Sequence, residues 1–324
     1  MKRLISLLLC ALLIVPALAE DAPDFEPIPW DIKVSPNLPN PDCYLPNNGG
    51  YHDDSIDIQI NVTYWTQDLQ QVDAPGEGTT TVMSARVKLT DVSQFRTGFA
   101  NKYPSKQARH VNDMTKRFNA VMGIDGDYCL YHEQGIVVRN GQTLRMRPHK
   151  GRDELIVDEN GDFHLITGTT QAKWDEYIAG GGTVLHAFCF GPALVVDGVP
   201  LTSLDDVTID NGKAKKAQRM VIGQIGKLEY LILTNEGPES TAPKSVGFDL
   251  VQMANLCVQF GLDNAYNLDG GSSSTIALNN QKINSPSSHK NRMVGDCIWF
   301  ATLVKEETWR EKESVQTVEV EENK

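Results

Sequence analysis

Residues 250–275 read LVQMANLCVQFGLDNAYNLDGGSSST, and three patterns follow one another within them. The apolar residues of the first half recur at the spacing of one helix face: Leu250, Val251, Ala254, Cys257 and Val258. Gly261 stands where a helix commonly ends, so we expect a helix over about residues 248–260 that packs on a sheet. A short, partly apolar strand then ends at Asp269, before two glycines and four hydroxyl residues.

The segments before this helix have the two-residue period of strands. Ile56, Ile58, Ile60 and Val62 alternate with polar residues, and Val82–Leu89 has a similar pattern. We therefore expect one strand to begin near Ser55 and a second to span 82–89.

Tight turns join several of the later strands. The dipeptides at 140–141 and 197–198, Asn-Gly and Asp-Gly, each follow a β-branched run, and both favour hairpins because they adopt positive φ readily. Residues 158–161 form another expected turn, and residues 219–234 contain two strand-like runs around a glycine. We expect a single-domain α/β (α+β) fold with a mixed, mainly antiparallel sheet and a few packed helices.

The chain of 324 residues is long enough for one large domain or two ordinary ones. We expect a signal peptide over 1–19, an extended leader rich in proline and asparagine over 20–54, one domain over 55–304 and a charged tail over 305–324. The tail contains seven glutamates and four basic residues, which is typical of a solvated helix or a disordered segment.

The N-terminus has the three regions of an export signal. Lys2 and Arg3 are positive, an apolar stretch runs over residues 4–15, and Ala17-Leu18-Ala19 is a small-x-small cleavage site. The alternative is a membrane anchor, but the apolar stretch is well short of the ~20 residues of a spanning helix. We expect a secreted or periplasmic protein with no membrane span after cleavage.

The balance of charge excludes one class of partner. The chain has 30 basic and 42 acidic residues, a net charge of -12, which becomes -14 once Lys2 and Arg3 are removed with the signal. Nucleic-acid binders need basic surface to displace counterions from phosphates, so we expect no nucleic-acid partner. An anionic substrate would be held by a local cationic pocket rather than attracted by the net charge.

Five cysteines remain after cleavage of the signal, which contains Cys10. They are Cys43, Cys129, Cys189, Cys257 and Cys297. An odd number leaves at least one thiol unpaired in a monomer, and the connectivity of any bridges stays open. No spacing suggests a zinc knuckle, and we expect Cys257 to pack in the core as a small apolar group.

The loop after Asp269 suits an anionic oxygen. Gly270 and Gly271 allow the backbone to approach a ligand and turn its N–H groups inward, and the hydroxyls of residues 272–275 supply more donors. The same run is also typical of an ordinary surface turn, so a purely structural role is the alternative.

The order of several segments resembles the phosphodiester glycosidase family over about residues 111–303. The matching segments are GIDGDY at 123–128, GIVVRNG at 135–141, PALVVDG at 192–198, RMVIG at 219–223, NLDGGSSST at 267–275, NSP at 284–286 and RMV at 292–294. Asn-Leu-Asp-Gly-Gly is the specific part. The family usually has Asn where Asp125 stands and a third glycine where Ser272 stands, so this chain has an extra acid near the expected site and a less permissive loop.

This resemblance implies hydrolysis of the glycosidic bond of a sugar 1-phosphodiester, such as an N-acetylglucosamine 1-phosphodiester, in a small molecule or a glycan. It implies Asp269 as base or nucleophile and Asp125 or Asp127 as a second carboxylate. Glu236, another acid at a strand end, ranks below Asp269. The residues expected to bind the substrate are Arg219, Gly270, Gly271, Ser273, Thr275 and Arg292. No cofactor is expected.

Other roles stay open for several of these residues. Arg219 could be a surface salt-bridge partner, and Asp125 and Asp127 could cap a turn or hold a calcium ion. The alternative function is a non-catalytic carbohydrate or cell-wall binding protein. A third is a hydrolase that uses Ser273 or Ser274, although no histidine partner is evident.

Several well-known catalytic motifs are absent from the sequence. His132-Glu133 is not followed by the second histidine of an H-E-x-x-H zinc helix. The sequence also lacks the G-x-S-x-G elbow of α/β-hydrolases and the phosphate-binding loop of nucleotide hydrolases.

The export signal yields the first testable prediction. The exported protein should begin near Glu20, because the small-x-small site ends at Ala19. N-terminal sequencing of the exported protein checks this, and an exported form that still begins at Met1 would rule out cleavage.

Overall fold

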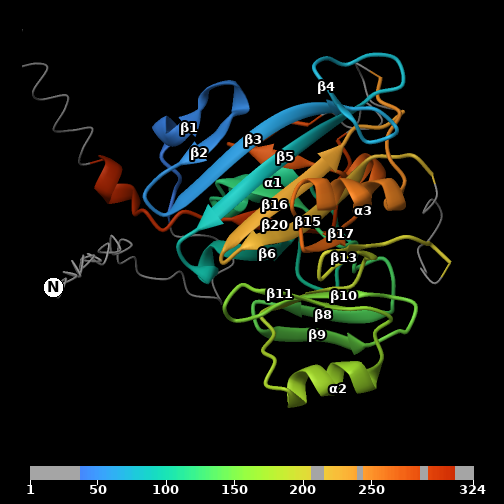
Figure 1. Cartoon of the computed structure of the whole chain (residues 1–324). Coiled ribbons are helices and arrows are strands. Elements are labelled where there is room, and N and C mark those ends of the chain that lie inside the picture. Colours follow the sequence, from blue (N-terminus) through green and yellow to red (C-terminus); the bar gives the residue numbers. More distant parts are fainter. Residues whose placement is uncertain (1–36, 206–214, 239–243, 285–290, 311–324) are drawn as a thin grey trace, which may run out of the picture.

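The computed structural model describes residues 37–205, 215–238, 244–284 and 291–310 (Figure 1). The expected signal peptide, most of the leader and residues 311–324 of the tail lie outside this range.

The largest of three sheets, the main sheet, has the strand order β1-β2-β3-β5-β16-β15-β17-β13-β14, with β4 beside β3. Its strands are β1 (Tyr44–Leu45), β2 (Gly50–His52), β3 (Ile56–Trp65), β4 (Gln71–Val72), β5 (Thr80–Leu89), β13 (Ala193–Val196), β14 (Val199–Pro200), β15 (Arg219–Gly226), β16 (Glu229–Asn235) and β17 (Asn264–Asn267).

Two five-stranded sheets complete the fold. The second sheet, in the order β19-β18-β7-β20-β6, contains β6 (Phe95–Phe99), β7 (Met122–Asp125), β18 (Ile276–Leu278), β19 (Gln281–Lys282) and β20 (Asp296–Phe300). The third sheet, in the order β11-β10-β12-β8-β9, contains β8 (Gly135–Arg139), β9 (Gln142–Arg147), β10 (Glu154–Val157), β11 (Phe163–Ile166) and β12 (His186–Phe188).

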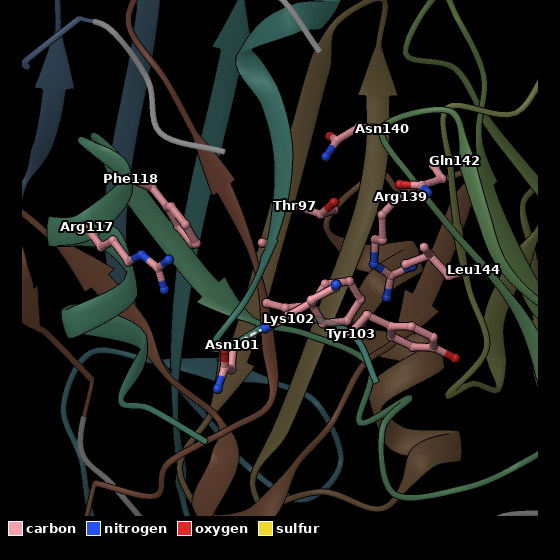
Figure 2. A pocket seen from close by; sticks show the side chains of 12 residues that line it. Thr97, Asn101, Lys102, Tyr103, Arg117, Phe118, Arg139, Asn140, Gln142 and Leu144 are labelled. Atoms are coloured by element: carbon pink, nitrogen blue, oxygen red, sulfur yellow. Dashed lines mark hydrogen bonds between the residues drawn. The ribbon is translucent and has the colours of Figure 1, made fainter. Parts of the chain in front are cut away.

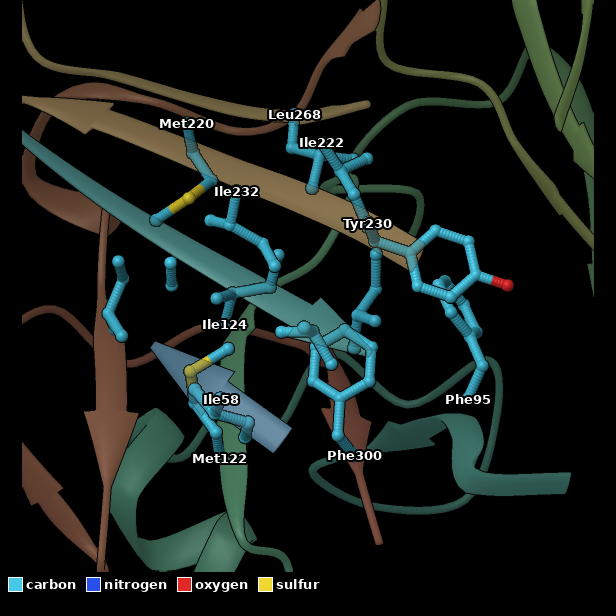
Figure 3. Close-up of a cluster of buried hydrophobic side chains, with 14 of the residues drawn as sticks. Ile58, Phe95, Met122, Ile124, Met220, Ile222, Tyr230, Ile232, Leu268 and Phe300 are labelled. Carbon is cyan, nitrogen blue, oxygen red and sulfur yellow. The ribbon is translucent and has the colours of Figure 1, made fainter. Parts of the chain in front are cut away.

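The core lies mainly between the main and second sheets (Figure 3). Ile222 and Ile232 come from the main sheet, and Ile124 and Phe300 from the second, and all four are fully buried. Tyr230 extends this core toward the third sheet, because its hydroxyl donates to the Gly161 carbonyl at 2.8 Å. Burial of this much apolar surface holds the sheets together.

One helix packs on each sheet: α1 (Val111–Phe118), α2 (Gln171–Ala179) and α3 (Leu250–Gln259). Phe118 of α1 stacks on Trp299 of the second sheet with ring centroids 5.2 Å apart. Trp174 of α2 packs on the third sheet, which lies to one side of the other two (Figure 1). The helix expected over residues 248–260 is α3, whose apolar face packs on the main sheet and whose Cys257 is fully buried, as predicted.

The local turn chemistry is confirmed. Asn140 and Gly141 have φ of 51° and 73°, and they join β8 to β9. Asp197 and Gly198 have φ of 49° and 77°, and they join β13 to β14. Every strand pair in the described part of the chain is antiparallel, so the α+β class is confirmed with its mainly antiparallel sheet.

The leader expected over 20–54 overlaps the fold, because ordered structure begins before residue 55. Strands β1 and β2 already belong to the main sheet, and Tyr51 is fully buried. The Tyr51 ring packs edge-on against Tyr44, and its hydroxyl donates to Asp53 at 2.8 Å. Strands of two or three residues are too short to show a period in the sequence.

In the described residues, no helix has the length and apolar character needed to cross a membrane. The five cysteines of the expected mature chain are free thiols, and all except Cys43 are buried.

Candidate active site

A pocket of about 410 Å³ lies around Asp269. Its lining residues are Tyr128, His132, Arg152, Phe190, Lys215, Ala217, Arg219, Asn267, Leu268, Asp269, Gly270, Gly271 and Arg292. Four of them are cationic at neutral pH, whereas Asp269 is the one carboxylate that lines this pocket in the described part of the chain. The pocket is therefore a cationic site on an acidic protein.

The register of the main sheet explains how Arg219 and Asp269 meet. Strands β15 and β17 are antiparallel, with Val221 opposite Asn267. The Leu268 N–H still donates to the Met220 carbonyl at 2.8 Å, so the same register continued beyond the end of β17 brings Arg219 opposite Asp269. Opposite residues project to the same face of a sheet, so both side chains reach the same pocket.

Asp269 lies two residues after the end of β17 and is held there by hydrogen bonds. Its backbone N–H donates to the Gly126 carbonyl at 3.1 Å, and its Oδ1 accepts from the Gly270 N–H at 2.8 Å. Burial raises the pKa of the Asp269 carboxyl, and the Ser273 hydroxyl, the Arg292 charge and the Gly270 N–H oppose the rise. A raised pKa brings a carboxylate closer to the range in which it is an effective base.

The expectation that the glycine loop turns its N–H groups toward an anion is wrong. Gly270 donates to Asp269, and Gly271 donates to the Gln218 carbonyl at 3.0 Å. The next N–H groups that the structure pairs, those of Ser273, Ser274 and Thr275, donate to Gly270, Gly271 and Asp125. Five of the six N–H groups of residues 270–275 are thus paired within the protein, so the positive charge of the pocket comes mainly from side chains.

Arg219 lies in the pocket as expected, and it is also bound to the backbone. Its Nη2 donates to the Lys215 carbonyl at 2.6 Å and its Nε to the Phe248 carbonyl at 3.3 Å. Burial lowers the pKa of Arg219 to about 10, so it keeps its charge at neutral pH. Arg292 is exposed, and its guanidinium lies over the Tyr128 ring, 5.6 Å from the centroid.

Asp125 lies behind the pocket rather than in it. The side chain is fully buried at the end of β7, and its Oδ1 accepts from the Thr275 N–H at 2.8 Å. Burial and then the negative charge of Asp269 raise the pKa of Asp125 well above its usual value. Asp125 therefore holds the loop after Asp269, and contact with substrate is blocked by its burial.

Asp127 belongs to a buried ion network, not to the pocket. Arg139 Nη2 lies 2.9 Å from Asp127 Oδ1 and 3.1 Å from Asp296 Oδ2. Burial alone would raise the pKa of Asp127, but the Arg139 charge and a hydrogen bond from the Cys189 N–H lower it. Burial and the Asp127 charge raise the pKa of Asp296. One guanidinium thus neutralises Asp127, while Asp296 tends to keep its proton.

Two of the alternatives raised by the sequence find no support in this geometry. The positive charge beside Asp127 is that of Arg139. The potential metal ligands that lie close together are Asp127, Cys129 and Asp296, and Asp125 is not among them. A calcium ion between Asp125 and Asp127 would therefore compete with a resident guanidinium.

The hydrolase that would use Ser273 or Ser274 also lacks support, because no hydrogen bond joins either serine to a histidine in the described residues.

Three other expected site residues lie outside the pocket lining. Ser273 and Thr275 are fully buried, and Thr275 Oγ1 accepts from Lys282 at 3.0 Å. Glu236 follows β16, and its N–H donates to the Thr81 carbonyl at 2.8 Å. Ser273 and Thr275 are buried inside the loop, and their burial keeps both side chains from direct contact with a substrate.

The fold brings to the pocket several residues that no sequence pattern indicates. Arg152 comes from the loop before β10, Lys215 precedes β15, and His132 lies between β7 and β8. The His132 Nδ1 donates to the Gln134 carbonyl at 3.0 Å, since a carbonyl can only accept. Burial lowers the pKa of His132, so it adds no positive charge at neutral pH.

Solved structures share this arrangement of sheets. The catalytic domain of zebrafish N-acetylglucosamine-1-phosphodiester alpha-N-acetylglucosaminidase, auto-inhibited by its pro-peptide, aligns with a TM-score of 0.58 at 15% identity, over 78% of this chain and 86% of that chain. A hypothetical protein from Synechocystis aligns with a TM-score of 0.50 at 14% identity, over 76% of this chain and 62% of that one. The protein thus has the fold of a sugar-phosphodiester hydrolase domain.

The sequence comparison identifies the family itself. The family model for phosphodiester glycosidases matches residues 118–301, which is more than half of the chain. The chain belongs to the phosphodiester glycosidase family, a family of hydrolases, and the resemblance over residues 111–303 is confirmed.

A curated relative gives no further functional detail. The chain is 26% identical over 193 residues to the SPbeta prophage-derived uncharacterized protein YomE of Bacillus subtilis strain 168. The match covers 58% of this chain but only 29% of that relative.

The ion network predicts a large loss of stability when it is broken. Asp127→Ala should lower the free energy of unfolding by about 3–5 kcal/mol, because it leaves the Arg139 charge buried with less compensation. Asp57→Ala, which removes an exposed pairing with His52, should cost less than about 1 kcal/mol. Denaturant unfolding of both variants checks this, and equal losses would contradict a structural role for Asp127.

The burial of Asp125 predicts a pH-dependent effect. The pKa of Asp125 is higher in the folded chain than the value of about 3.9 expected in the unfolded chain. At a pH between these two values, the unfolded chain releases a proton that the folded chain keeps. Stability is therefore lost as pH rises through this window. Asp125→Asn removes the effect and keeps an oxygen for the Thr275 N–H, so its melting temperature should gain on that of the wild type as the pH rises above about 4. A constant difference would contradict the raised pKa.

Proposed function

We propose that this protein hydrolyses the glycosidic bond of a sugar 1-phosphodiester. The observation that carries the proposal is the pocket itself, in which Asp269 faces a site lined by Arg152, Lys215, Arg219 and Arg292. Membership of a hydrolase family supports the reaction class.

The charges of the pocket fit a phosphodiester. The protein has a net charge of -12, so an anion needs local positive groups to bind. Arginine guanidinium groups bind phosphate oxygens in charge-assisted hydrogen bonds. Arg219 is the arginine expected to hold the phosphate and Arg292 is an expected substrate-binding residue, and Arg152 and Lys215 extend the same cationic lining.

The sugar has a place beside the phosphate. Asn267 Nδ2 donates to the Gly191 carbonyl at 2.8 Å, whereas its buried Oδ1 has no hydrogen-bond partner in the described residues. A sugar hydroxyl could donate to this oxygen and remove the cost of an unsatisfied acceptor. Tyr128 and Phe190 add aromatic surface on which the apolar face of a sugar ring can pack.

Asp269 supplies the base. As a base, it takes a proton from water while the water oxygen bonds to the anomeric carbon. The bond from that carbon to the phosphate oxygen breaks, and its electron pair leaves with the phosphate monoester, whose charge the arginines stabilise. If Asp269 instead bonds the anomeric carbon first, a covalent intermediate forms and configuration is retained.

We also propose that the protein acts outside the cytoplasm. The support is the pattern of an export signal over residues 1–19. A sugar phosphodiester in a cell-surface or extracellular glycan would then be the natural kind of substrate.

Incubation of the purified protein with an N-acetylglucosamine 1-phosphodiester tests the proposed reaction. Release of free sugar together with a phosphate monoester is expected. Binding of the diester without turnover would favour the non-catalytic carbohydrate-binding alternative, and neither binding nor turnover would reject a sugar phosphodiester of this kind.

The role of Asp269 predicts a specific kinetic loss. Asp269→Asn keeps the shape of the side chain and removes its charge, so turnover should fall by roughly 10²–10⁴-fold while folding persists. Asp263→Asn, an exposed acid on the same segment, should change neither property. Turnover and melting temperature are measured on the same samples. Full turnover in Asp269→Asn would remove Asp269 from the chemistry.

The phosphate contact predicts a change in binding. Arg219→Ala should remove roughly 1.5–3 kcal/mol of substrate binding if its guanidinium contacts the phosphate. Lys216→Ala is the matched control, because Lys216 is an exposed cation nearby that does not line the pocket. Titration with a non-hydrolysable diester gives the affinities. An unchanged affinity in Arg219→Ala, with lowered stability, would show that the arginine only supports the backbone.

A further inference from the structure

A second pocket, of about 270 Å³, shares no lining residue with the first. It lies between β6, α1 and the β8–β9 hairpin, and Figure 2 shows Arg139 and Leu144 on one side of it and Arg117 on the other. This volume lies just below the range of about 300–1,000 Å³ that is typical of pockets for drug-sized ligands, so the pocket suits one small ring. We call it the hairpin pocket.

Two buried polar atoms of the hairpin pocket have no hydrogen-bond partner in the described residues. They are Arg139 Nε, a donor, and Asn140 Oδ1, an acceptor. Arg139 is only 4% exposed, and its Nη atoms are already occupied by Asp127, Asp296 and backbone carbonyls. Buried groups of this kind cost stability unless something pairs with them. A ligand that offers both an acceptor and a donor, as hydroxyl groups do, would satisfy the two atoms.

The walls of the hairpin pocket combine aromatic and amide side chains. Phe99 and Tyr103 lie with ring centroids 5.3 Å apart, and Phe118 adds a third ring. The amides of Asn101 and Gln142 also line the pocket. A sugar ring has apolar faces that pack on aromatic surface and hydroxyl edges that bond to amides, so its chemistry matches both features.

The charge around the hairpin pocket is positive. Lys102 and Arg117 are exposed, both line the pocket, and the lining contains no acidic residue within the described chain. The charge of Arg139 is balanced by its ion pair with Asp127, so the unbalanced charges of the pocket are those of Lys102 and Arg117. A ligand that carries an anionic group would pair with them.

We propose that the hairpin pocket binds a single sugar ring that bears an anionic group, either a phosphate or a carboxylate. The ring lies against Phe99, Tyr103 and Phe118, its hydroxyls bond to Arg139 Nε and Asn140 Oδ1, and its anionic group faces Lys102 and Arg117. This site is separate from the Asp269 pocket and does not rest on the function proposed for that pocket.

Calorimetric titration of the purified protein tests the ligand class with four probes. Glucose 6-phosphate and glucuronate carry the two kinds of anionic group, glucose carries neither, and inorganic phosphate lacks the ring. At least one anionic sugar should bind at least about tenfold more tightly than either glucose or phosphate. The anionic sugar that binds more tightly shows whether the pocket prefers a phosphate or a carboxylate. The proposal is overturned if neither anionic sugar binds, or if glucose or phosphate binds as tightly as the better of the two anionic sugars.

Variants then locate the binding. The double variant Lys102→Ala/Arg117→Ala should weaken it by about tenfold or more. The matched control Lys106→Ala/Lys116→Ala removes two exposed cations from the same loop and helix, which do not line the pocket, and should bind normally. Unchanged affinity in the first variant overturns the proposal.

A third variant separates the two pockets. Arg219→Ala/Arg292→Ala alters only the Asp269 pocket, so anionic-sugar binding should persist in it. Loss of binding in this variant would assign the sugar to the Asp269 pocket and overturn the proposal. Hydrolysis of a sugar phosphodiester should be unaffected by Lys102→Ala/Arg117→Ala, so failure of the hairpin site and failure of the proposed reaction are distinguishable.

Discussion

The buried guanidinium of Arg139 is the interaction on which the two pockets depend. It comes from β8 of the third sheet and pairs with Asp127, just after β7, and with Asp296 on β20 of the second sheet. Charges removed from water in this way are tolerated only with close partners and further hydrogen bonds. The network therefore fixes how the third sheet lies against the second, and each pocket lies beside it.

The same network reaches the candidate catalytic group through the backbone. Gly126 donates to the Asp296 carbonyl and accepts from the Asp269 N–H, both at 3.1 Å. Asp269 is thus held by the segment that Arg139 anchors, and five of the six N–H groups of residues 270–275 are paired within the protein. With those donors used, Arg152, Lys215, Arg219 and Arg292 provide the positive charge of the pocket. The pocket thus combines a fixed carboxylate with cationic side chains, of which Arg219 is also held by backbone carbonyls.

The parts of the fold that could be predicted are those decided by neighbouring residues. The Asn-Gly and Asp-Gly hairpins and the helix Leu250–Gln259 follow from local turn chemistry and apolar period. The strand expected to end at Asp269 is β17, which ends at Asn267, so Asp269 could be placed close to a strand end for the same reason. The roles of Asp125 and Asp127 could not be separated, because they stand two residues apart and differ only in what packs on them: the Thr275 N–H on Asp125, and Arg139 on Asp127. His132, Arg152 and Lys215 reach the pocket from distant segments, and no local pattern marks them.

The central claim is that the bond broken is the glycosidic one, between the anomeric carbon and the phosphate oxygen. Hydrolysis of a sugar 1-phosphodiester in water enriched in heavy oxygen, followed by mass spectrometry of the released phosphate monoester, tests it most directly. Attack of water at the anomeric carbon leaves the phosphate without label, and this is the result that the account predicts. Heavy oxygen in the phosphate would show attack at phosphorus and would contradict it.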